Sequence, residues 1–110
     1  MMDKRLRRLA EIAAMIREAK LAELSRRAQV CQTLQDRLAG LDASVPVAGD
    51  LSFAAIESVA LRHERWAAPR RMMLNEQLAT ARAARMAAES EARAAFGRAL
   101  VLERLRDRGR

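Results

Sequence analysis

The sequence predicts an all-α protein in which two long antiparallel helices, joined by one short connection, form a coiled-coil hairpin. Three observations support this fold class. Apolar residues make up 51% of the 110 residues, but only 3% are aromatic, so each buried position removes little area from water. Neither Pro nor Gly occurs between Lys4 and Ala39. Ala, Arg, Leu and Glu dominate, a composition typical of long helices that meet along a narrow seam.

The first helix is expected over residues 4–40. Its larger apolar residues recur mostly at steps of three, four, seven or eight, which places them on one helix face. They are Leu6, Leu9, Ile12, Ile16, Leu24, Cys31, Leu34 and Leu38, with Ala13, Ala19 and Ala28 filling the gaps. Gly40 occupies the position where a glycine ends many helices, so we expect the helix to stop there after roughly 55 Å.

A turn is expected over residues 41–51, because this segment combines Pro46 and Gly49 with two aspartates. Ser52 is a suitable N-cap for the next helix. Leu51 and Ile56 occupy the two positions of a hydrophobic staple around that cap. These signals predict that the second helix begins at about residue 52.

The second helix is expected over residues 52–108, with a kink near Pro69. A proline inside a helix costs about 3 kcal/mol, which packing of Trp66 and Met73 against the first helix would offset. Gly97 is interpreted as a point of close helix contact. A helix of roughly 80 Å is longer than the first, so we expect a C-terminal overhang. The remaining apolar positions of this helix are Ile56, Val59 or Ala60, His63, Leu74, Leu78, Ala81, Ala88, Ala92, Ala95, Leu102 and Leu105.

The formal net charge of +7 favours an acidic partner, which could be nucleic acid, an anionic membrane surface or an acidic protein face. Basic residues gather at the start of the first helix and at the end of the second, and an antiparallel hairpin brings these two regions together. Four cations at a helix N-terminus oppose the helix dipole, so helix stability does not explain them. Two interpretations stay open, namely solvated charge that keeps the protein soluble and a docking site for an acidic partner.

The sequence offers little for catalysis, so we expect a protein that is not an enzyme and needs no metal or cofactor. His63 and Glu64 begin like a zinc-protease motif, but Ala67 stands where the second histidine belongs. Cys31 is the single cysteine, so no intrachain disulfide can form and a cytoplasmic setting is the default. There is no Gly-rich phosphate loop, and no uncharged apolar run approaches the length of about 20 residues that a membrane span needs.

Two segments carry a family resemblance. The stretch CQTLQDRLAGL contains Cys31, Gln32, Leu38 and Leu41, and the ending ALVLERLRDR is rich in Leu and Arg. With the basic two-helix architecture, these segments resemble the FliJ family of the bacterial flagellar export apparatus, whose relatives in virulence-associated type III secretion are the YscO-type proteins.

The resemblance implies a stalk and adaptor for a hexameric export ATPase. The paired helix ends would enter the ATPase ring, and a face nearer the bend would contact the cytoplasmic domain of the export gate. Escort of substrate chaperones is also attributed to the family. Carried onto this chain, the ATPase-facing tip would comprise Lys4, Arg5, Arg7, Arg8, Arg98, Leu102, Arg104, Leu105, Arg106 and Arg108.

The gate-binding face implied by the resemblance would comprise Gln32, Leu38, Leu41, Phe53, Ala60 and His63. Such a protein would be cytoplasmic and held at the inner face of the cell membrane through its partners. Two other functions stay open. One is a basic coiled coil that binds nucleic acid without sequence preference, and the other is a helical scaffold with no link to this family.

Overall fold

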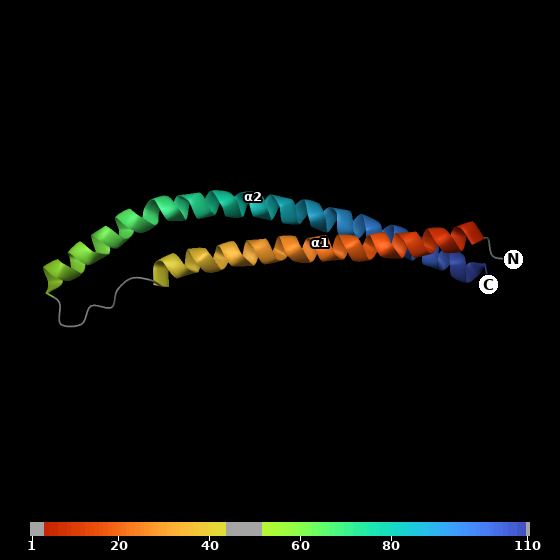
Figure 1. The fold of residues 1–110 in the computed structure, drawn as a ribbon, viewed down its shortest axis with the longest axis horizontal. Helices are drawn as coiled ribbons and strands as arrows, with labels where there is room; N and C mark the ends of the chain where they lie inside the picture. The colour runs from red at the N-terminus through yellow and green to blue at the C-terminus, as the bar shows by residue number, and fades with distance from the viewer. Residues whose placement is uncertain (1–3, 44–51, 110) are drawn as a thin grey trace. The chain divides into compact units, whose positions relative to one another are not determined.

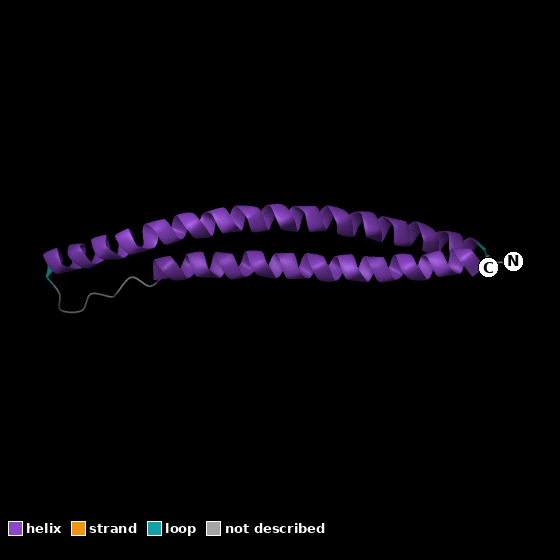
Figure 2. Cartoon of the chain, turned by 45° about the horizontal axis from the view of Figure 1, so that its top comes forward, coloured by secondary structure: helices purple, strands orange, loops and turns teal. Residues whose placement is uncertain are grey.

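The computed structural model describes residues 4–43 and 52–109, which form two α-helices. Helix α1 spans Lys4–Ala43 and helix α2 spans Phe53–Arg108. These residues contain no β-strand. The two helices run antiparallel (Figure 1), and the view coloured by secondary structure shows the same arrangement (Figure 2). The predicted all-α hairpin of two long helices is confirmed.

The hairpin divides into two compact units, and each unit contains one segment of each helix. Unit 1 comprises Met1–Gln29 and Arg82–Arg110, whereas unit 2 comprises Val30–Ala81. In unit 1 the first part of α1 lies beside the last part of α2, with Arg17 Nη1 3.3 Å from Glu103 Oε1. In unit 2 the end of α1 lies beside the first half of α2, with Arg71 Nη2 3.1 Å from Asp42 Oδ1.

The core of unit 2 is built from larger apolar side chains. Cys31, Leu34 and Leu78 are buried together, and partly buried side chains of Leu38, Leu74 and Ala81 pack against them. Along both helices these residues follow steps of three and four, the spacing that keeps one face turned toward a partner helix in a coiled coil. The three α1 residues in this core were all expected on the helix face that packs.

Unit 1 has a seam made of alanine instead. The buried residues of α1 in this unit are Ala10 and Ala13, and α2 supplies Ala88, Ala92, Ala95 and Ala99. Small side chains at the contact let two helices approach closely. The expectation that Leu9, Ile12 and Ile16 pack in the seam is wrong, because these side chains are 53%, 45% and 42% exposed. They lie next to the alanine row of α1 and are displaced to its flank.

The helix boundaries differ from expectation at one end of the turn. Helix α1 continues through Gly40 to Ala43, so residues 41–43 are helical. Gly40 does not adopt the left-handed conformation that would end the helix. Ser52 is confirmed as the N-cap of α2, since its Oγ accepts a hydrogen bond of 3.3 Å from the Ala55 N–H. Pro46, Gly49 and the staple residue Leu51 lie outside the described residues.

The expected C-terminal overhang is also wrong. In unit 1 Lys20 Nζ is 3.0 Å from Glu91 Oε2, and nearly equal numbers of residues separate this pair from Lys4 and from Arg108. The two helix ends are therefore close to level, as Figure 1 shows near the labelled termini. The additional length of α2 lies in unit 2, where its first turns precede the residues that contact the end of α1. The different lengths of the two helices therefore do not determine which residues lie opposite one another.

Helix α2 is unbroken at Pro69. The proline removes the donor that would satisfy the Arg65 carbonyl. One residue further along, Arg70 Nη1 donates a hydrogen bond of 2.8 Å to the Trp66 carbonyl oxygen. Trp66 does not pack into the seam as expected, because its neighbour Ala67 takes the buried position and leaves Trp66 44% exposed. Met73, expected to pack beside Trp66, is also largely exposed.

Gly97 was expected at a close helix contact, and the structure shows that it is not. A Cβ atom added at this position would meet nothing within 4 Å, and the residue is exposed. The close contacts of unit 1 are made by the alanines on the neighbouring face of α2.

Replacement of Ala99 by Leu tests the alanine seam. Ala99 is fully buried, so the larger side chain should force the helices apart and destabilise the protein by about 1–3 kcal/mol. Thermal unfolding followed by circular dichroism measures the change. Ala87→Leu, at an exposed position of the same helix, is the matched control and should leave the melting temperature nearly unchanged. A higher melting temperature for Ala99→Leu would show that the seam has room for larger side chains.

Candidate partner-binding surfaces

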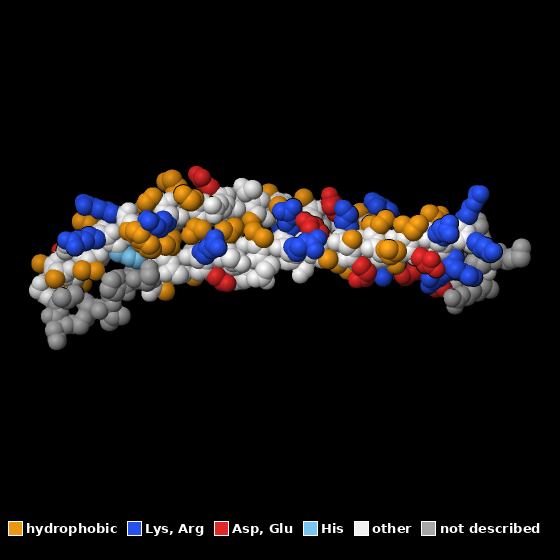
Figure 3. Space-filling view, in the orientation of Figure 1, with side chains coloured by type: hydrophobic (Ala, Val, Ile, Leu, Met, Phe, Trp, Pro, Cys, Tyr) orange, Lys and Arg blue, Asp and Glu red, His pale blue; other side chains and the backbone are white. Residues whose placement is uncertain are grey.

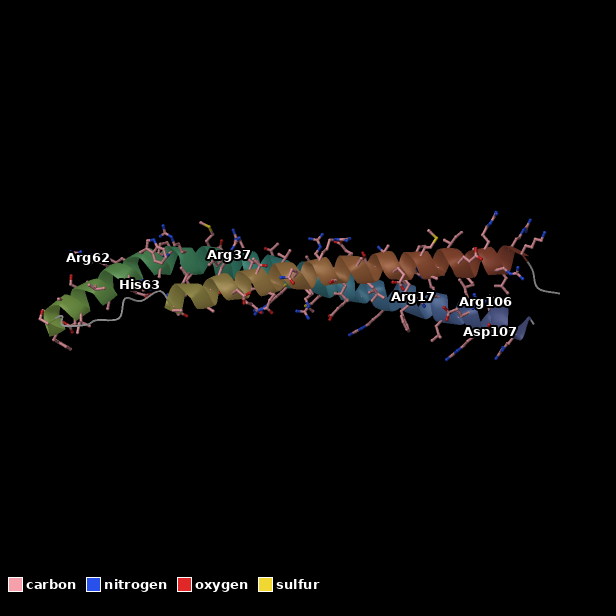
Figure 4. All side chains as sticks on the ribbon, turned by 60° about the horizontal axis from the view of Figure 1, so that its bottom comes forward. Arg17, Arg37, Arg62, His63, Arg106 and Asp107 are labelled. Atoms are coloured by element: carbon pink, nitrogen blue, oxygen red, sulfur yellow. The ribbon has the colours of Figure 1, made fainter. Side chains whose placement is uncertain are left out.

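The residues assigned to the ATPase-facing tip all lie in unit 1. They come from the first turns of α1 and the last turns of α2, and space-filling Figure 3 shows Lys and Arg side chains gathered at this end. Most are exposed, but Leu102 and Arg106 are half-buried. Figure 4 shows Arg106 on the last turns of α2 beside Asp107, and its Nε lies 3.7 Å from Asp107 Oδ1. Because it is half-buried, Arg106 is less accessible to a partner than the exposed arginines of the tip.

An apolar groove accompanies this basic end of unit 1. Its volume is about 180 Å³, and Arg98 is the one charged side chain among the described residues that line it. The remaining lining residues are Leu9, Ile12, Ala13, Ile16, Ala95 and Leu102. The larger side chains do not fit into the alanine seam, so they lie beside it and form the walls of the groove. Sequence periodicity alone missed it, although α1 carries two apolar rows one residue apart.

Ion pairs connect the two helices of unit 1 beside this seam. Arg17 pairs with Glu103 and also lies over the ring of Phe96, with its guanidinium carbon 5.8 Å from the ring centroid. Lys20 pairs with Glu91 at 3.0 Å. Partly exposed pairs of this kind contribute at most about 1 kcal/mol each, so they fix the register of the helices more than they stabilise them.

The residues assigned to the gate-binding face lie in unit 2 and fall into two groups. Leu41 is 8% exposed and Leu38 packs against the core, so both hold the helices together. His63, labelled in Figure 4, is half-buried, and its Nε2 lies 2.9 Å from the Leu41 carbonyl oxygen. The last carbonyl groups of a helix lack partners within the helix, and His63 satisfies one of them. The exposed members are Gln32, Phe53 and Ala60.

Arg71 connects both helices of unit 2 near the same point. Its guanidinium is 2.9 Å from Glu64 Oε1 and 3.1 Å from Asp42 Oδ1. The hydrogen bond that Arg71 donates lowers the pKa of Glu64, and the hydrogen bonds that Glu64 and Asp42 accept from Arg71 raise the pKa of the guanidinium. Arg71 occupies a seam position but reaches the surface to pair, as long cationic side chains commonly do.

A second groove opens on unit 2 and has a different chemical character. Its volume is about 510 Å³, and both helices contribute to its walls. It combines an exposed aromatic side chain, two arginines and an apolar floor. Its lining residues are Arg37, Gly40, Leu41, Trp66, Arg70, Met73, Leu74 and Gln77. We call it the Trp66 groove. From the sequence, Trp66 was expected to pack in the helix interface.

The described residues contain no group of three or more His, Cys, Asp or Glu side chains that could hold a metal ion. In the same residues, neither helix has a stretch long and apolar enough to cross a membrane. Comparisons of the chain with protein-family models, curated proteins and solved structures found no match.

The ion pairs of Arg71 predict a measurable titration. Since the folded-state pKa of Glu64 is lowered, its pairing stabilises the fold above the pKa of an unfolded glutamate and is lost as pH falls through the lower folded-state value. Arg71→Gln should return the pKa of Glu64 toward its ordinary range. NMR titration of the side-chain carboxyl groups measures this shift.

Glu23 is the control for that titration, because hydrogen bonds from Arg26 and Arg27 lower its pKa independently of Arg71. Its pKa should stay low in Arg71→Gln. An unchanged Glu64 titration in the variant would show that Arg71 does not pair with it in solution.

Proposed function

We propose that this protein is a non-enzymatic stalk and adaptor of a bacterial flagellar, type III protein-export ATPase, linking the ATPase to the export gate and to substrate chaperones. One observation carries the proposal. Unit 1 combines basic side chains from both helix ends with an apolar groove that its own helices leave open. Exposed apolar surface beside charge is typical of protein-binding sites. The resemblance to the FliJ family supplies the identity of the partner.

The physical properties of unit 1 suit such a contact. Exposed cations at the tip would accelerate encounter with an acidic surface, and the larger apolar side chains would then supply contact area. Leu9, Ile12 and Ile16 are each about half-exposed, so a partner can bury them without disturbing the alanine seam. In this proposal the arginines set the rate of association, and the apolar groove sets the lifetime of the complex.

Charge reversal at Arg104 and Arg108 tests the ATPase contact. Both residues are exposed at the end of α2, and replacement by Glu should raise the concentration of this protein that half-maximally stimulates the export ATPase by about tenfold. The matched control is Arg82→Glu with Arg85→Glu, the same charge change at exposed positions of α2 in unit 1 but away from the tip. Steady-state ATP hydrolysis and hexamer formation are the measurements.

The same two variants separate the export function from nonspecific binding of nucleic acid. Nonspecific binding depends on how many cations contact phosphates, so both variants should weaken DNA retention to a similar extent. Equal behaviour of the two variants, with no stimulation of the ATPase by the original protein, would reject the stalk and favour the nucleic-acid alternative.

Phe53 tests the gate contact separately. It is 76% exposed at the start of α2, and an exposed aromatic side chain is a common source of binding energy at interfaces. Phe53→Ser should weaken binding to the cytoplasmic domain of the export gate about tenfold, while leaving ATPase stimulation intact. Calorimetric titration measures the affinity, and Leu61→Ser at another exposed position of α2 is the control. Equal affinities for the two variants would remove Phe53 from the contact.

A further inference from the structure

The Trp66 groove exposes side chains that do not contribute to the packed core of unit 2. Trp66 is 44% exposed although it is the largest side chain type in proteins and the single tryptophan of this chain. Leu41, Met73 and Leu74 form an apolar surface next to it. Interfaces between proteins are enriched in Trp, Met and Arg, and their strongest contacts are usually made by Trp, Tyr and Arg. The groove contains three of these residue types within one unit.

Arg70 orients the tryptophan. Its guanidinium carbon lies 4.5 Å from the centroid of the Trp66 ring, and its Nη1 donates to the Trp66 carbonyl oxygen. The ring of His63 also lies near the indole, at a centroid distance of 5.6 Å. Two side chains therefore contact Trp66 while part of its surface faces solvent, and a ligand would find the indole already positioned.

The charge of the groove has one sign. Arg37 comes from α1 and Arg70 from α2, so the two helices each contribute one cation. Neither arginine pairs with a carboxylate of the described residues, and none of the Asp and Glu side chains described in this structure lines the groove. A ligand with carboxylates on both sides of an apolar strip would match this pattern.

Gly40 supplies an independent observation. Glycine costs up to roughly 1 kcal/mol relative to alanine inside a helix, and Gly40 lies in the last turn of α1 with no positive φ. A Cβ added to it would meet nothing within 4 Å, so the packing of unit 2 does not require glycine there. Because Gly40 lines the Trp66 groove, its missing side chain leaves the wall open for a closely approaching ligand.

We propose that the Trp66 groove binds an acidic amphipathic helix of a partner protein, with the apolar face of that helix on Trp66 and Met73 and its carboxylates beside Arg37 and Arg70. Two adjacent helices present a valley into which the apolar row of a third helix fits. The proposal goes beyond the stalk function, since Leu41 is the one residue that the groove shares with the assigned gate face.

Two other occupants fit less well. A second copy of this chain also carries a net charge of +7 and would bring further arginines toward Arg37 and Arg70. Single-stranded nucleic acid is usually held by successive aromatic side chains on which several bases stack, and Trp66 is the one tryptophan, with no tyrosine in the chain. An acidic helix uses both the apolar floor and the cations.

The test uses a synthetic helical peptide of about four turns, with leucines spaced i, i+3, i+4 and i+7, glutamates on both flanks and no aromatic residue. Since the protein has one tryptophan and no tyrosine, its emission reports directly on Trp66. We expect a saturable change in this emission on titration with the peptide. A counterpart peptide with lysines in place of the glutamates should produce none.

Gly40→Gln places a side chain in the groove and should weaken peptide binding about tenfold, while leaving the protein at least as stable, because glutamine has a higher helix propensity than glycine. Gly97→Gln is the matched control, because it makes the same change at an equally open helical position in unit 1 and should not alter binding. Arg37→Gln with Arg70→Gln should also weaken binding about tenfold, whereas Arg82→Gln with Arg85→Gln should change it little.

Several results would overturn the assignment. These are absence of saturable binding of the acidic peptide, equal affinities for the two glycine variants, or equal binding of the lysine peptide. Tighter binding of an oligothymidine that also depends on Gly40 would assign the groove to nucleic acid, and a concentration-dependent change in Trp66 emission without peptide would assign it to a second copy. ATPase stimulation by Gly40→Gln should be unchanged, so the stalk proposal is tested separately.

Discussion

The constraint on which both units depend is that a two-helix interface can bury one row of side chains from each helix. Seam residues of α1 and α2 recur at steps of three and four, so each helix presents a narrow face to the other. In unit 2 that face carries Cys31, Leu34 and Leu78, which fill the contact. In unit 1 it carries alanine, and the contact closes before larger neighbouring side chains can enter it. The large apolar side chains that do not fit into the seam therefore lie on the surface of each unit.

Because large side chains do not fit into the seam, both candidate binding surfaces contain large apolar residues that are exposed to solvent. Ile12 and Ile16 lie beside the alanine row, and Trp66 lies beside the fully buried Ala67. In each case a small residue occupies the seam and a large one flanks it. Exposing a large apolar side chain forgoes about 1.5–3 kcal/mol relative to its full burial. A partner that covers these residues recovers part of that free energy, which connects the packing of the seam to the binding of other proteins.

The sequence predicted the helical hairpin, the N-cap at Ser52 and the placement of Cys31 and Leu34 in the interface. These features depend on local chemistry or on a single periodic row. It did not predict which of two adjacent rows forms the seam of unit 1, because Leu9 and Ala10 differ by one position and only the facing alanines of α2 decide between them. The end of α1 was misplaced because glycine tolerates ordinary helical geometry, and Gly40 adopts it. Neither groove could be predicted, since each needs residues from both helices in a known register.

The alanine seam of unit 1 does not by itself determine which residues of α1 and α2 lie opposite one another. The buried residues of this seam are all alanines at regular steps, so their packing distinguishes one register from another less sharply than side chains of different sizes would. Charged residues beside the seam specify the register instead. Arg17 reaches Glu103 and Lys20 reaches Glu91 in one register, and a shifted register would separate both pairs. Each pair contributes at most about 1 kcal/mol, but 1.4 kcal/mol already changes a population tenfold. Weak surface pairs therefore select the register that keeps the two basic helix ends level, because the alanine seam beside them distinguishes registers less sharply.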